Sequence, residues 1–343
     1  MRKTFGKRRH PPTSSKVPPV EADVGSNTLS EADFLARCRP KLDALEDIRV
    51  EKFAVFKRRK KLAIPTAAIL TPVLGFIDYW LLMLQRSSDD GAAGLTLVVL
   101  GALWFWVTIP KRQYAKAYKT KILPEIARLF GDFTYDVKGK IPMRAMKPSG
   151  IVPGHSGYNS EDHFSGLYKG VSIDLSEIKL TKKSGKRTVT VFNGLAVLLS
   201  GGTKPFSGHT IIVKDKTSVG AWAKAKISGL KRANFVDLEF ERMFDVFTTD
   251  QTEARYLIDP VIMENLKVMQ GEFNGDSLTA SFYDDHVLIL IESSTNHFEP
   301  AKIDIPATDE TELMSLRDEI AQILSIVDQL SLLSAKNKRL HAS

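Results

Sequence analysis

The chain has 343 residues, 43% of them hydrophobic, and a formal net charge of +8 from 48 Lys and Arg against 40 Asp and Glu residues. This length allows one or two domains, and the composition is that of an ordinary folded protein. A single cysteine excludes an intramolecular disulfide, in agreement with a reducing compartment. The net positive charge is compatible with binding to nucleic acid or to an anionic membrane surface. The distribution of the basic residues along the chain distinguishes the two.

The first segment, residues 1–28, is basic and rich in proline, with almost no large apolar residues, and we expect it to be disordered. It lacks the apolar stretch of a cleavable signal peptide. From Ser30, a candidate helix N-cap, apolar residues recur at helical spacing and predict an amphipathic helix over residues 29–61. Cys38 lies on this helix and is expected to be a buried small hydrophobe rather than a reactive thiol.

Two apolar blocks follow, residues 62–84 and 91–109, and Asp78 is their only charged residue. As helices they would be roughly 34 and 28 Å long, against a bilayer hydrocarbon core of about 30 Å. Buried helices of a soluble core are normally shorter and carry polar residues once per turn. The blocks therefore predict two transmembrane helices. Asp78 is expected to be a hydrated interfacial residue rather than a proton relay, since no second ionisable group accompanies it.

Basic residues flank both spans. Five lie consecutively at 57–61 and five more lie between 111 and 121, whereas the short connector carries one Arg and two Asp. Cations are retained on the cytoplasmic side, so both termini are predicted to be cytoplasmic. Residues 110–130 again show helical spacing of apolar residues. We expect this second juxtamembrane helix to pack antiparallel on the first and extend the hairpin as a stalk.

The positive charge is concentrated beside the membrane. Residues 1–61 hold 16 basic and 8 acidic groups, whereas residues 122–343 hold 26 basic and 29 acidic groups. The soluble part is thus nearly neutral and lacks the basic footprint of a nucleic-acid-binding domain. We expect no nucleic-acid partner, and attraction of the basic flanks to anionic lipid headgroups instead.

Residues 131–162 are rich in glycine, proline and polar residues and are predicted to be a linker to a cytoplasmic α+β domain over residues 163–335. Alternating apolar residues predict β-strands in the first half of this domain. The alternation changes register near Ser176 and Glu177, which predicts a β-bulge there. The predicted strands cover residues 171–175, 178–180, 189–191, 195–199, 209–213, 235–240 and 243–247.

Helices and strands alternate in the second half. Asp250 and Glu253 form a capping-box pattern, and Asp259 before Pro260 starts a second short helix that ends near Gly271. Strands are predicted at 277–283 and 286–292, and an amphipathic helix over 313–330 closes the domain. The expected fold is an α+β domain with an antiparallel sheet and helices on one side. The strand order stays open, and a pleckstrin-homology-like barrel is one alternative.

The sequence contains no motif that predicts a reaction. A phosphate-binding loop, a dinucleotide fingerprint and a nucleophile elbow are all missing. The only histidines near metal-ligand spacing are His155 and His163, which we interpret as a solvated loop pair. We therefore predict no catalytic residue, no cofactor and no metal. The densest polar cluster comprises Asp250, Glu253, Arg255 and Tyr256. It is either an anionic-ligand or catalytic site, or a set of helix caps and ion pairs, and the structural interpretation is favoured.

The same cluster carries a family resemblance. The chain resembles the bacterial domain-of-unknown-function family 3137, most strongly over residues 160 to 300, in the segments Phe244–Leu257, Pro260, Met263–Glu264, Ser281–Phe282 and Phe298–Pro300. Its two-span hairpin matches the layout of that family. The resemblance implies an uncharacterised protein of the bacterial inner membrane, and it implies no catalytic residues. Such proteins are sometimes encoded beside LemA-type membrane proteins, so it also implies a membrane-complex partner of that type.

From these observations we expect a membrane-anchored cytoplasmic binding or scaffold module. The alternative is an unrecognised membrane-bound hydrolase or transferase that uses the Asp250 to Tyr256 cluster; it requires a pocket where these side chains converge. A transporter is disfavoured, because two spans enclose no pathway without oligomerisation. A homo-oligomer stays open.

Overall fold

The structure is a computed structural model that describes residues 30–84, 95–201, 205–214, 227–272 and 277–340. The segment 1–28, expected to be disordered, and the connector between the two candidate spans lie outside the described residues.

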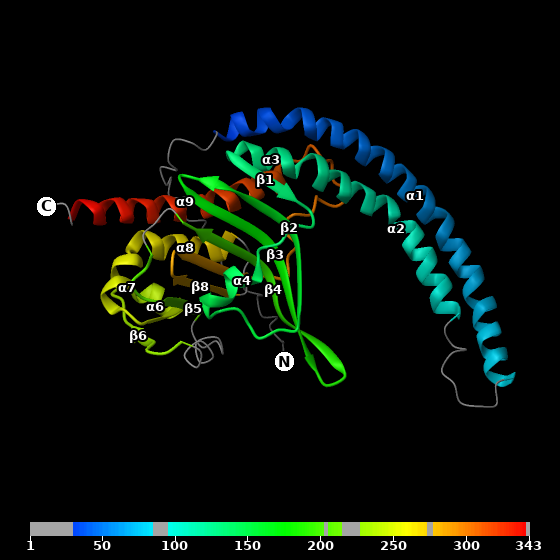
Figure 1. The fold of residues 1–343 in the computed structure, drawn as a ribbon. Helices are drawn as coiled ribbons and strands as arrows, with labels where there is room; N and C mark the ends of the chain where they lie inside the picture. The colour runs from blue at the N-terminus through cyan, green and yellow to red at the C-terminus, as the bar shows by residue number, and fades with distance from the viewer. Residues whose placement is uncertain (1–29, 85–94, 202–204, 215–226, 273–276, 341–343) are drawn as a thin grey trace, which may run out of the picture.

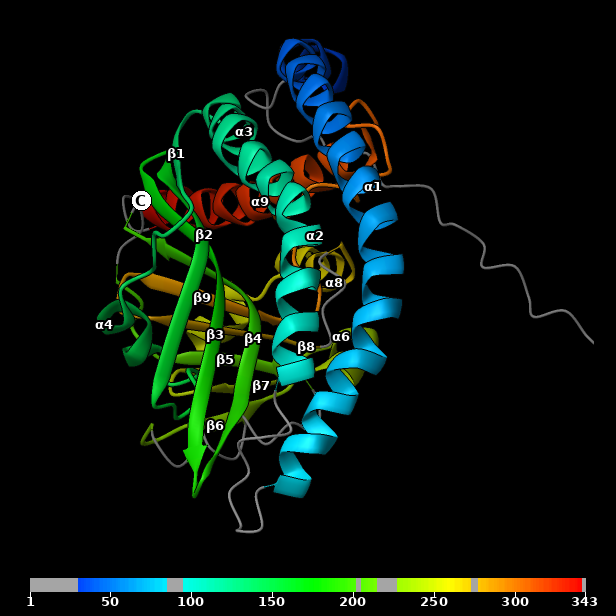
Figure 2. The same cartoon turned by 90° about the vertical axis from the view of Figure 1, so that its right-hand side faces the viewer.

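A long helical hairpin forms the first part of the chain. Helix α1 (Glu31–Leu84) runs antiparallel to α2 (Leu95–Lys121), and α3 (Leu123–Leu129) continues from α2 after a break (Figures 1 and 2). The predicted helix 29–61 and the predicted span 62–84 are thus one uninterrupted helix. The predicted helix 110–130 is divided at Ile122, because Pro124 in the first turn of α3 has no backbone N–H to extend the hydrogen bonds of α2. We use the name stalk for three parts together: α1 up to residue 61, α2 from residue 110, and α3.

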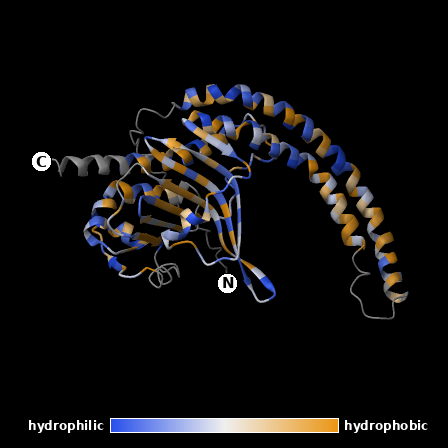
Figure 3. Ribbon diagram, in the orientation of Figure 1, coloured by the Kyte–Doolittle hydropathy of each residue, from blue (hydrophilic) through white to orange (hydrophobic). Residues whose placement is uncertain are grey.

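Both long helices are long and apolar enough to cross a membrane, and only 11% of each apolar window is buried. Large apolar side chains on them are exposed, for example Ile69 at 68%, Phe76 at 64% and Leu97 at 72%. Hydrophobic residues dominate the far half of the hairpin, and hydrophilic residues increase toward the stalk (Figure 3). A core helix of a soluble protein would instead be mostly buried.

Asp78 lies near the far end of α1 and is 8% exposed. Its Oδ2 accepts hydrogen bonds from the backbone N–H and the hydroxyl of Thr96, at 3.2 and 2.6 Å, in the first turn of α2. A carboxylate there satisfies a free N–H and complements the helix dipole. Asp78 therefore caps the neighbouring helix, where the sequence predicted a hydrated interfacial residue.

The rest of the chain folds around one antiparallel sheet of nine strands in the order β1-β2-β3-β4-β9-β8-β5-β7-β6. Among the described strands, β1 and β6 have one neighbour each, so the sheet is open and the barrel alternative is wrong. The strands are β1 (Asp132–Asp136), β2 (Gly157–Tyr168), β3 (Val171–Ser184), β4 (Arg187–Ser200), β5 (Thr210–Lys214), β6 (Lys231–Ala233), β7 (Phe244–Thr248), β8 (Ser277–Tyr283) and β9 (His286–Glu292).

The helices of this part are short, except for the last. They are α4 (Met143–Met146) with the 3-10 turn η2 (Lys147–Ser149), α6 (Leu238–Met243), α7 (Gln251–Leu257), α8 (Pro260–Glu272) and α9 (Thr311–Leu340). The two-helix hairpin, the antiparallel sheet and the closing helix agree with the predicted α+β class.

Two predicted segments differ from the structure. Residues 131–162, expected as a linker, form β1, α4, η2 and the start of β2, and bury Ile141 and Met146 completely. Residues 235–240 are not a strand, because Asp237 accepts hydrogen bonds from the N–H groups of Glu239 and Phe240 and starts α6.

The predicted bulge lies on the neighbouring strand. Strand β2 carries an extra residue between Glu161 and Phe164, opposite Ser176, whereas β3 pairs with β4 without interruption through Ser176. The change of register in β3 has another origin. Val171, Ile173 and Leu175 face one apolar cluster, and Ile178 and Leu180 face a second cluster on the opposite side of the sheet. The buried face of β3 therefore changes halfway along the strand.

This change divides the core in two. The larger cluster joins the stalk, α8 and α9 to one face of the sheet, and includes Cys38, which is 3% exposed, as predicted. Burial is the main cause that raises the pKa of the Cys38 thiol to about 11, and the negative charge of Glu125 adds to it. The smaller cluster packs residues 141–152, which include the short helix α4, on the opposite face, so the prediction that the helices lie on one side of the sheet is wrong for α4. Where the helices no longer cover β2, β3 and β4, the sheet face that carries the larger cluster bears polar residues instead.

Candidate functional site

The predicted polar cluster lies at the junction of β7 and α7. Asp250 Oδ1 accepts hydrogen bonds from the N–H groups of Thr252 and Glu253, at 2.9 and 3.0 Å, so it is the N-cap of α7 as predicted. Glu253 does not complete the capping box. Its two carboxylate oxygens accept hydrogen bonds from the N–H groups of Ser207 and Gly208, both at 2.7 Å, and hold the loop before β5.

In the part of the chain that the structure describes, no ion pair joins Arg255 to Asp250 or Glu253. Arg255 is exposed and Tyr256 is half-buried on α7. Hydrogen bonds from the backbone hold the pKa of Asp250 below its usual range, and the bond from the N–H of Glu253 has the largest effect. Both carboxylates are thus occupied by backbone N–H groups. This geometry is that of a structural junction, and it does not favour a catalytic site.

A second polar cluster, which the sequence did not indicate, lies where the stalk meets the sheet. The ammonium group of Lys119 on α2 lies 2.6 Å from Asp162 Oδ2 and 2.6 Å from Glu299 Oε1. The hydroxyl of Tyr135 on β1 donates to the other oxygen of Asp162. Lys119 is 8% exposed and Asp162 is fully buried. We call Lys119, Asp162, Glu299 and Tyr135 the docking cluster.

Local structure explains how these groups meet. Asp162 occupies the bulge of β2 with a φ of 53°, a left-handed conformation that Asp tolerates better than most residues. Burial by itself would lower the pKa of Lys119, but its hydrogen bonds to Asp162 and Glu299 outweigh burial and raise that pKa. Burial and the hydrogen bond to Asp162 raise the pKa of Tyr135. The cluster therefore holds a charged lysine in a protected site.

A second contact holds the other stalk helix. Arg49 on α1 is 8% exposed; it donates to Ile303 O at 2.7 Å and bonds to both carboxylate oxygens of Glu46, at 2.8 and 2.6 Å. Glu46 in turn accepts from the N–H of Ala307 at 2.6 Å. Both stalk helices are thus attached to the sheet domain by charged hydrogen bonds in protected positions.

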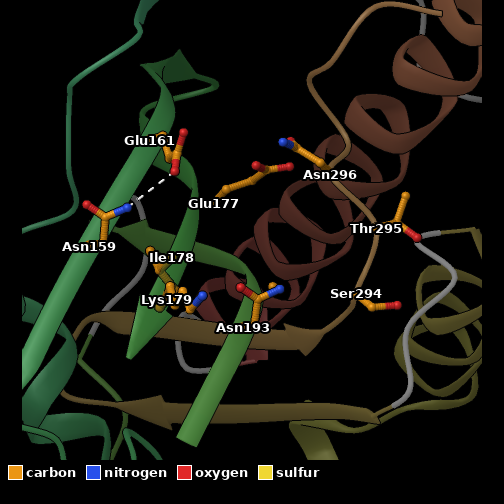
Figure 4. A pocket seen from close by; sticks show the side chains of 10 residues that line it. Asn159, Glu161, Glu177, Ile178, Lys179, Asn193, Ser294, Thr295 and Asn296 are labelled. Carbon is orange, nitrogen blue, oxygen red and sulfur yellow. Dashed lines mark hydrogen bonds between the residues drawn. The ribbon is translucent and has the colours of Figure 1, made fainter. Parts of the chain in front are cut away.

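Next to the docking cluster lies a polar pocket of about 280 Å³ (Figure 4). Its floor is the uncovered face of β2, β3 and β4, and the loop after β9 forms a wall. This floor follows from the register, because Glu161 pairs with Glu177 and Lys179 pairs with both Asn159 and Asn193. The pocket is lined by Asn159, Glu161, Glu177, Ile178, Lys179, Asn193, Gly194, Ser294, Thr295 and Asn296.

The wall is held closely against the floor. Asn193 donates from its side chain to Ser293 O at 2.8 Å, and the N–H of Ser293 donates to Asn193 O at 3.0 Å. Gly194 has a φ of +149°, and a Cβ atom there would lie 2.0 Å from Ile291 O. Only glycine fits this approach of two backbones.

Glu177 is the central titratable group of the pocket. Its Oε1 accepts from the N–H of His297 at 2.6 Å, and the side-chain amide nitrogen of Asn296, oriented by this network, faces both carboxylate oxygens. Burial raises the pKa of Glu177 to about 7, against the opposing effect of the His297 N–H, and the negative charge of Asp162 raises it further. The charge of Glu177 therefore changes near neutral pH, and its pKa depends on the charge of the docking cluster.

Among the described residues, no group of three or more His, Cys, Asp or Glu side chains has the geometry of a metal site. The pocket instead offers carboxylate and amide acceptors from Glu161, Glu177 and Asn193, with one lysine at the rim. Such a lining can hold a small polar ligand that presents hydrogen-bond donors.

Residues 190–332 match a family model described as a protein of unknown function (DUF3137). The resemblance found in the sequence is therefore confirmed, although the matched region begins and ends later than residues 160 to 300. No curated protein and no solved structure matches the chain. One segment of the resemblance, Phe298–Pro300, lies at the docking cluster, since Glu299 belongs to that cluster and the ring centroids of Phe298 and Phe164 lie 5.0 Å apart.

Replacing Lys119 by methionine should destabilise the protein, because Asp162 would stay buried without its cation. Removal of one partner from a buried ion pair costs about 3–5 kcal/mol, and we expect a fall in melting temperature on the order of 10 °C. Thermal unfolding in detergent, followed through the exposure of Cys38 to a thiol-reactive dye, measures this. The double variant K119M/D162N should recover much of the loss, and a single variant that melts like the wild type contradicts the assignment.

Glu253→Ala should lower the stability by about 1–3 kcal/mol, because two backbone N–H groups lose their acceptor. The exposed neighbour Thr252 provides the matched control, and T252A should change the stability little. The same unfolding measurement compares the two variants. An unchanged melting temperature for E253A would remove the structural role of Glu253 and reopen the catalytic interpretation.

The raised pKa of Glu177 predicts a pH dependence of stability. Since the folded protein holds this proton more tightly than the unfolded chain, the stabilisation is complete below about pH 4.5 and is lost as the pH rises through 7. Glu177→Gln does not ionise, so its melting temperature relative to the wild type should rise over this interval. A difference that is independent of pH between 4.5 and 8 would show that Glu177 does not titrate there.

Proposed function

We propose that this chain, which carries a domain of unknown function, is a membrane-anchored binding module whose β2–β4 pocket takes a small polar ligand on the cytoplasmic side. The spans 62–84 and 91–109 anchor it, both termini are cytoplasmic, and the stalk holds the sheet domain near the bilayer. The exposed apolar surface of α1 and α2 and the basic residues at the stalk end support this anchorage and orientation. A bacterial inner membrane is the location that the family resemblance implies.

The single observation that carries the binding role is the polar floor of the pocket. Glu161 and Glu177 face it together with three asparagines, at a place where the helices leave the sheet uncovered. An antiparallel sheet often presents one polar face to water, but here the loop after β9 encloses part of that face and makes a pocket of it. The carboxylates favour a ligand with an amine or several hydroxyl donors. Because Glu177 ionises near pH 7, a cationic ligand should bind more tightly as the pH rises through that value.

A photo-crosslinking amino acid in place of Thr295, in the wall of the pocket, tests this role in intact cells. We expect a discrete adduct, identified by mass spectrometry, that decreases in E177Q. The same amino acid in place of Val236, which is 97% exposed on another part of the domain, is the control and should give no such adduct. Equal adducts at both positions, or none at Thr295, would reject the pocket as the binding site.

Anchorage has its own test. The protein should stay in the membrane fraction during alkaline extraction, and a cysteine replacing Ser87 in the connector should react with an impermeant maleimide added outside the cell. Release by alkali, or labelling only after the cell is opened, contradicts the anchorage or its orientation.

We further propose that the module works within a membrane complex, with a LemA-type protein as the first partner to test. This rests on the resemblance alone, and a homo-oligomer is the competing assembly. Crosslinking through the exposed face of α1 distinguishes the two by the mass of the adduct. An enzymatic role for Asp250 to Tyr256 has no comparable geometric support.

A further inference from the structure

Strands β3 and β4 continue beyond the rest of the sheet as a two-stranded ribbon. The last partner of β3 on β2 is Gly157, opposite Thr181, and β4 pairs with β9 only from Gly194 onward. Among the described strands, residues 182–190 therefore pair only with one another, across a turn at Gly185 that has a φ of 61°. Figures 1 and 2 both show this ribbon projecting from the domain.

The register of the ribbon determines which backbone groups point away from it. Ser184 lies opposite Arg187 across a two-residue turn, and such a turn is closed by two residues that bond to each other. Hydrogen-bonded and non-hydrogen-bonded pairs then alternate along an antiparallel ribbon. The N–H and C=O groups of Thr188 and Thr190 therefore point outward from β4.

One edge of the ribbon is occupied and the other is open. On the β3 side, the N–H of Lys183 points outward and donates to Ser156 Oγ at 3.1 Å, as the alternation requires. On the β4 side, no described residue outside the ribbon bonds to the backbone of residues 187–191. Four of these five residues are β-branched and none is proline, so the segment is well suited to pairing with another strand. We call residues 187–191 the open edge; it is roughly 17 Å long.

The outer strands of the sheet are protected in other ways. Strand β1 has only five residues and carries Asp132 and Asp136 at its ends, and a carbonyl of β6, Arg232 O, accepts from the side chain of Gln251 at 3.2 Å. Short strands and covering groups of this kind prevent unwanted pairing. The backbone of the open edge has no such cover, and charged side chains alone decide what can approach it.

Those side chains are all basic. Lys182, Lys183, Lys186 and Arg187 are exposed, and residues 178–200 contain no Asp or Glu. In the part of the chain that the structure describes, no carboxylate pairs with any of the four. Because successive side chains of a strand point to opposite faces, Lys182 and Lys183 place positive charge on both faces of the ribbon beside the open edge.

The backbone and the charge together define the occupant. Free N–H and C=O groups at strand spacing match another extended peptide, whereas lipid headgroups and nucleic acid do not reproduce this spacing. A second copy of the ribbon would bring four further positive charges, and residues 1–28 and 331–343 of this chain are also basic. Like charges on neighbouring strands destabilise a sheet, whereas opposite charges stabilise it. The open edge therefore suits a strand that is acidic.

We propose that the open edge of β4 binds an acidic, extended segment of another protein, which adds a strand to the ribbon. The backbone of this segment bonds to Thr188 and Thr190, and its carboxylates lie beside the four basic side chains. The inference uses neither the proposed pocket nor the proposed anchorage.

Binding of a synthetic peptide to the full chain in detergent tests the proposal. The probe is a fluorescent octapeptide of alternating glutamate and valine, and fluorescence anisotropy measures its dissociation constant. The control octapeptide alternates glutamate and proline, so it has the same charge but cannot pair as a strand. We expect the valine peptide to bind on the order of tenfold more tightly than the proline peptide, and more weakly at high salt.

Two variants separate the backbone from the charge. T188P/T190P removes two outward N–H groups, a change that an edge strand tolerates, and should weaken binding on the order of tenfold although every charge stays in place. The matched control T188V/T190V keeps these N–H groups and should bind like the wild type. K182E/K183E/K186E/R187E should abolish binding. Thermal unfolding checks that each variant is folded, and if T188P/T190P is not, the two peptides still decide on the wild type.

Equal affinities for the two peptides, or undiminished binding to a folded T188P/T190P, would show that charge alone attracts acidic chains and would overturn the proposal. Absence of binding to the wild type overturns it as well. A dimer that T188P/T190P dissociates in sedimentation would assign the open edge to a second copy, and displacement of the valine peptide by phosphatidylglycerol vesicles would assign the basic residues to lipid; either result contradicts the acidic strand.

Discussion

The buried ammonium group of Lys119 is the point on which the arrangement of this molecule depends. It is the last charged position but one of α2, and it reaches two carboxylates that come from distant parts of the chain. A lysine is stable in such a place only when acceptors surround it closely, and their removal would leave an unpaired charge. The sheet domain is thereby bound in one orientation to α2, the helix that contains the second candidate membrane span.

The pocket follows from the same constraint. The bulge that turns Asp162 toward Lys119 lies beside Glu161, which lines the pocket. Because the buried face of β3 changes near Ser176, Glu177 lies on a part of the sheet that no described helix covers. Glu177 senses the charge of Asp162, which contributes to its raised pKa. A ligand that binds to Glu177 would therefore change the electrostatic environment of the joint between domain and anchor. The proposed binding and the proposed anchorage would thus be linked through this one region.

The sequence predicts the parts of this structure that rest on local patterns. Strands β8 and β9 occur at the predicted residues because short alternating segments flank a tight turn, and Asp250 and Asp259 cap the predicted helices. The docking cluster could not be predicted. Lys119 looks like one more positive charge beside a span, and Asp162 lies in a segment whose glycines and prolines indicate a linker. Their contact joins residues 43 positions apart, and only the tertiary fold shows it.

The distance between the stalk and the sheet domain tests most directly whether Lys119 holds the domain in one orientation. Spin labels at V50C on α1 and V236C before α6, measured by pulsed electron resonance in nanodiscs, report their relative position; both residues are exposed. We predict one narrow distance distribution for the native joint and a broad one when Lys119 is replaced by methionine. Equally narrow distributions in both proteins would show that the buried lysine does not hold the domain on its anchor.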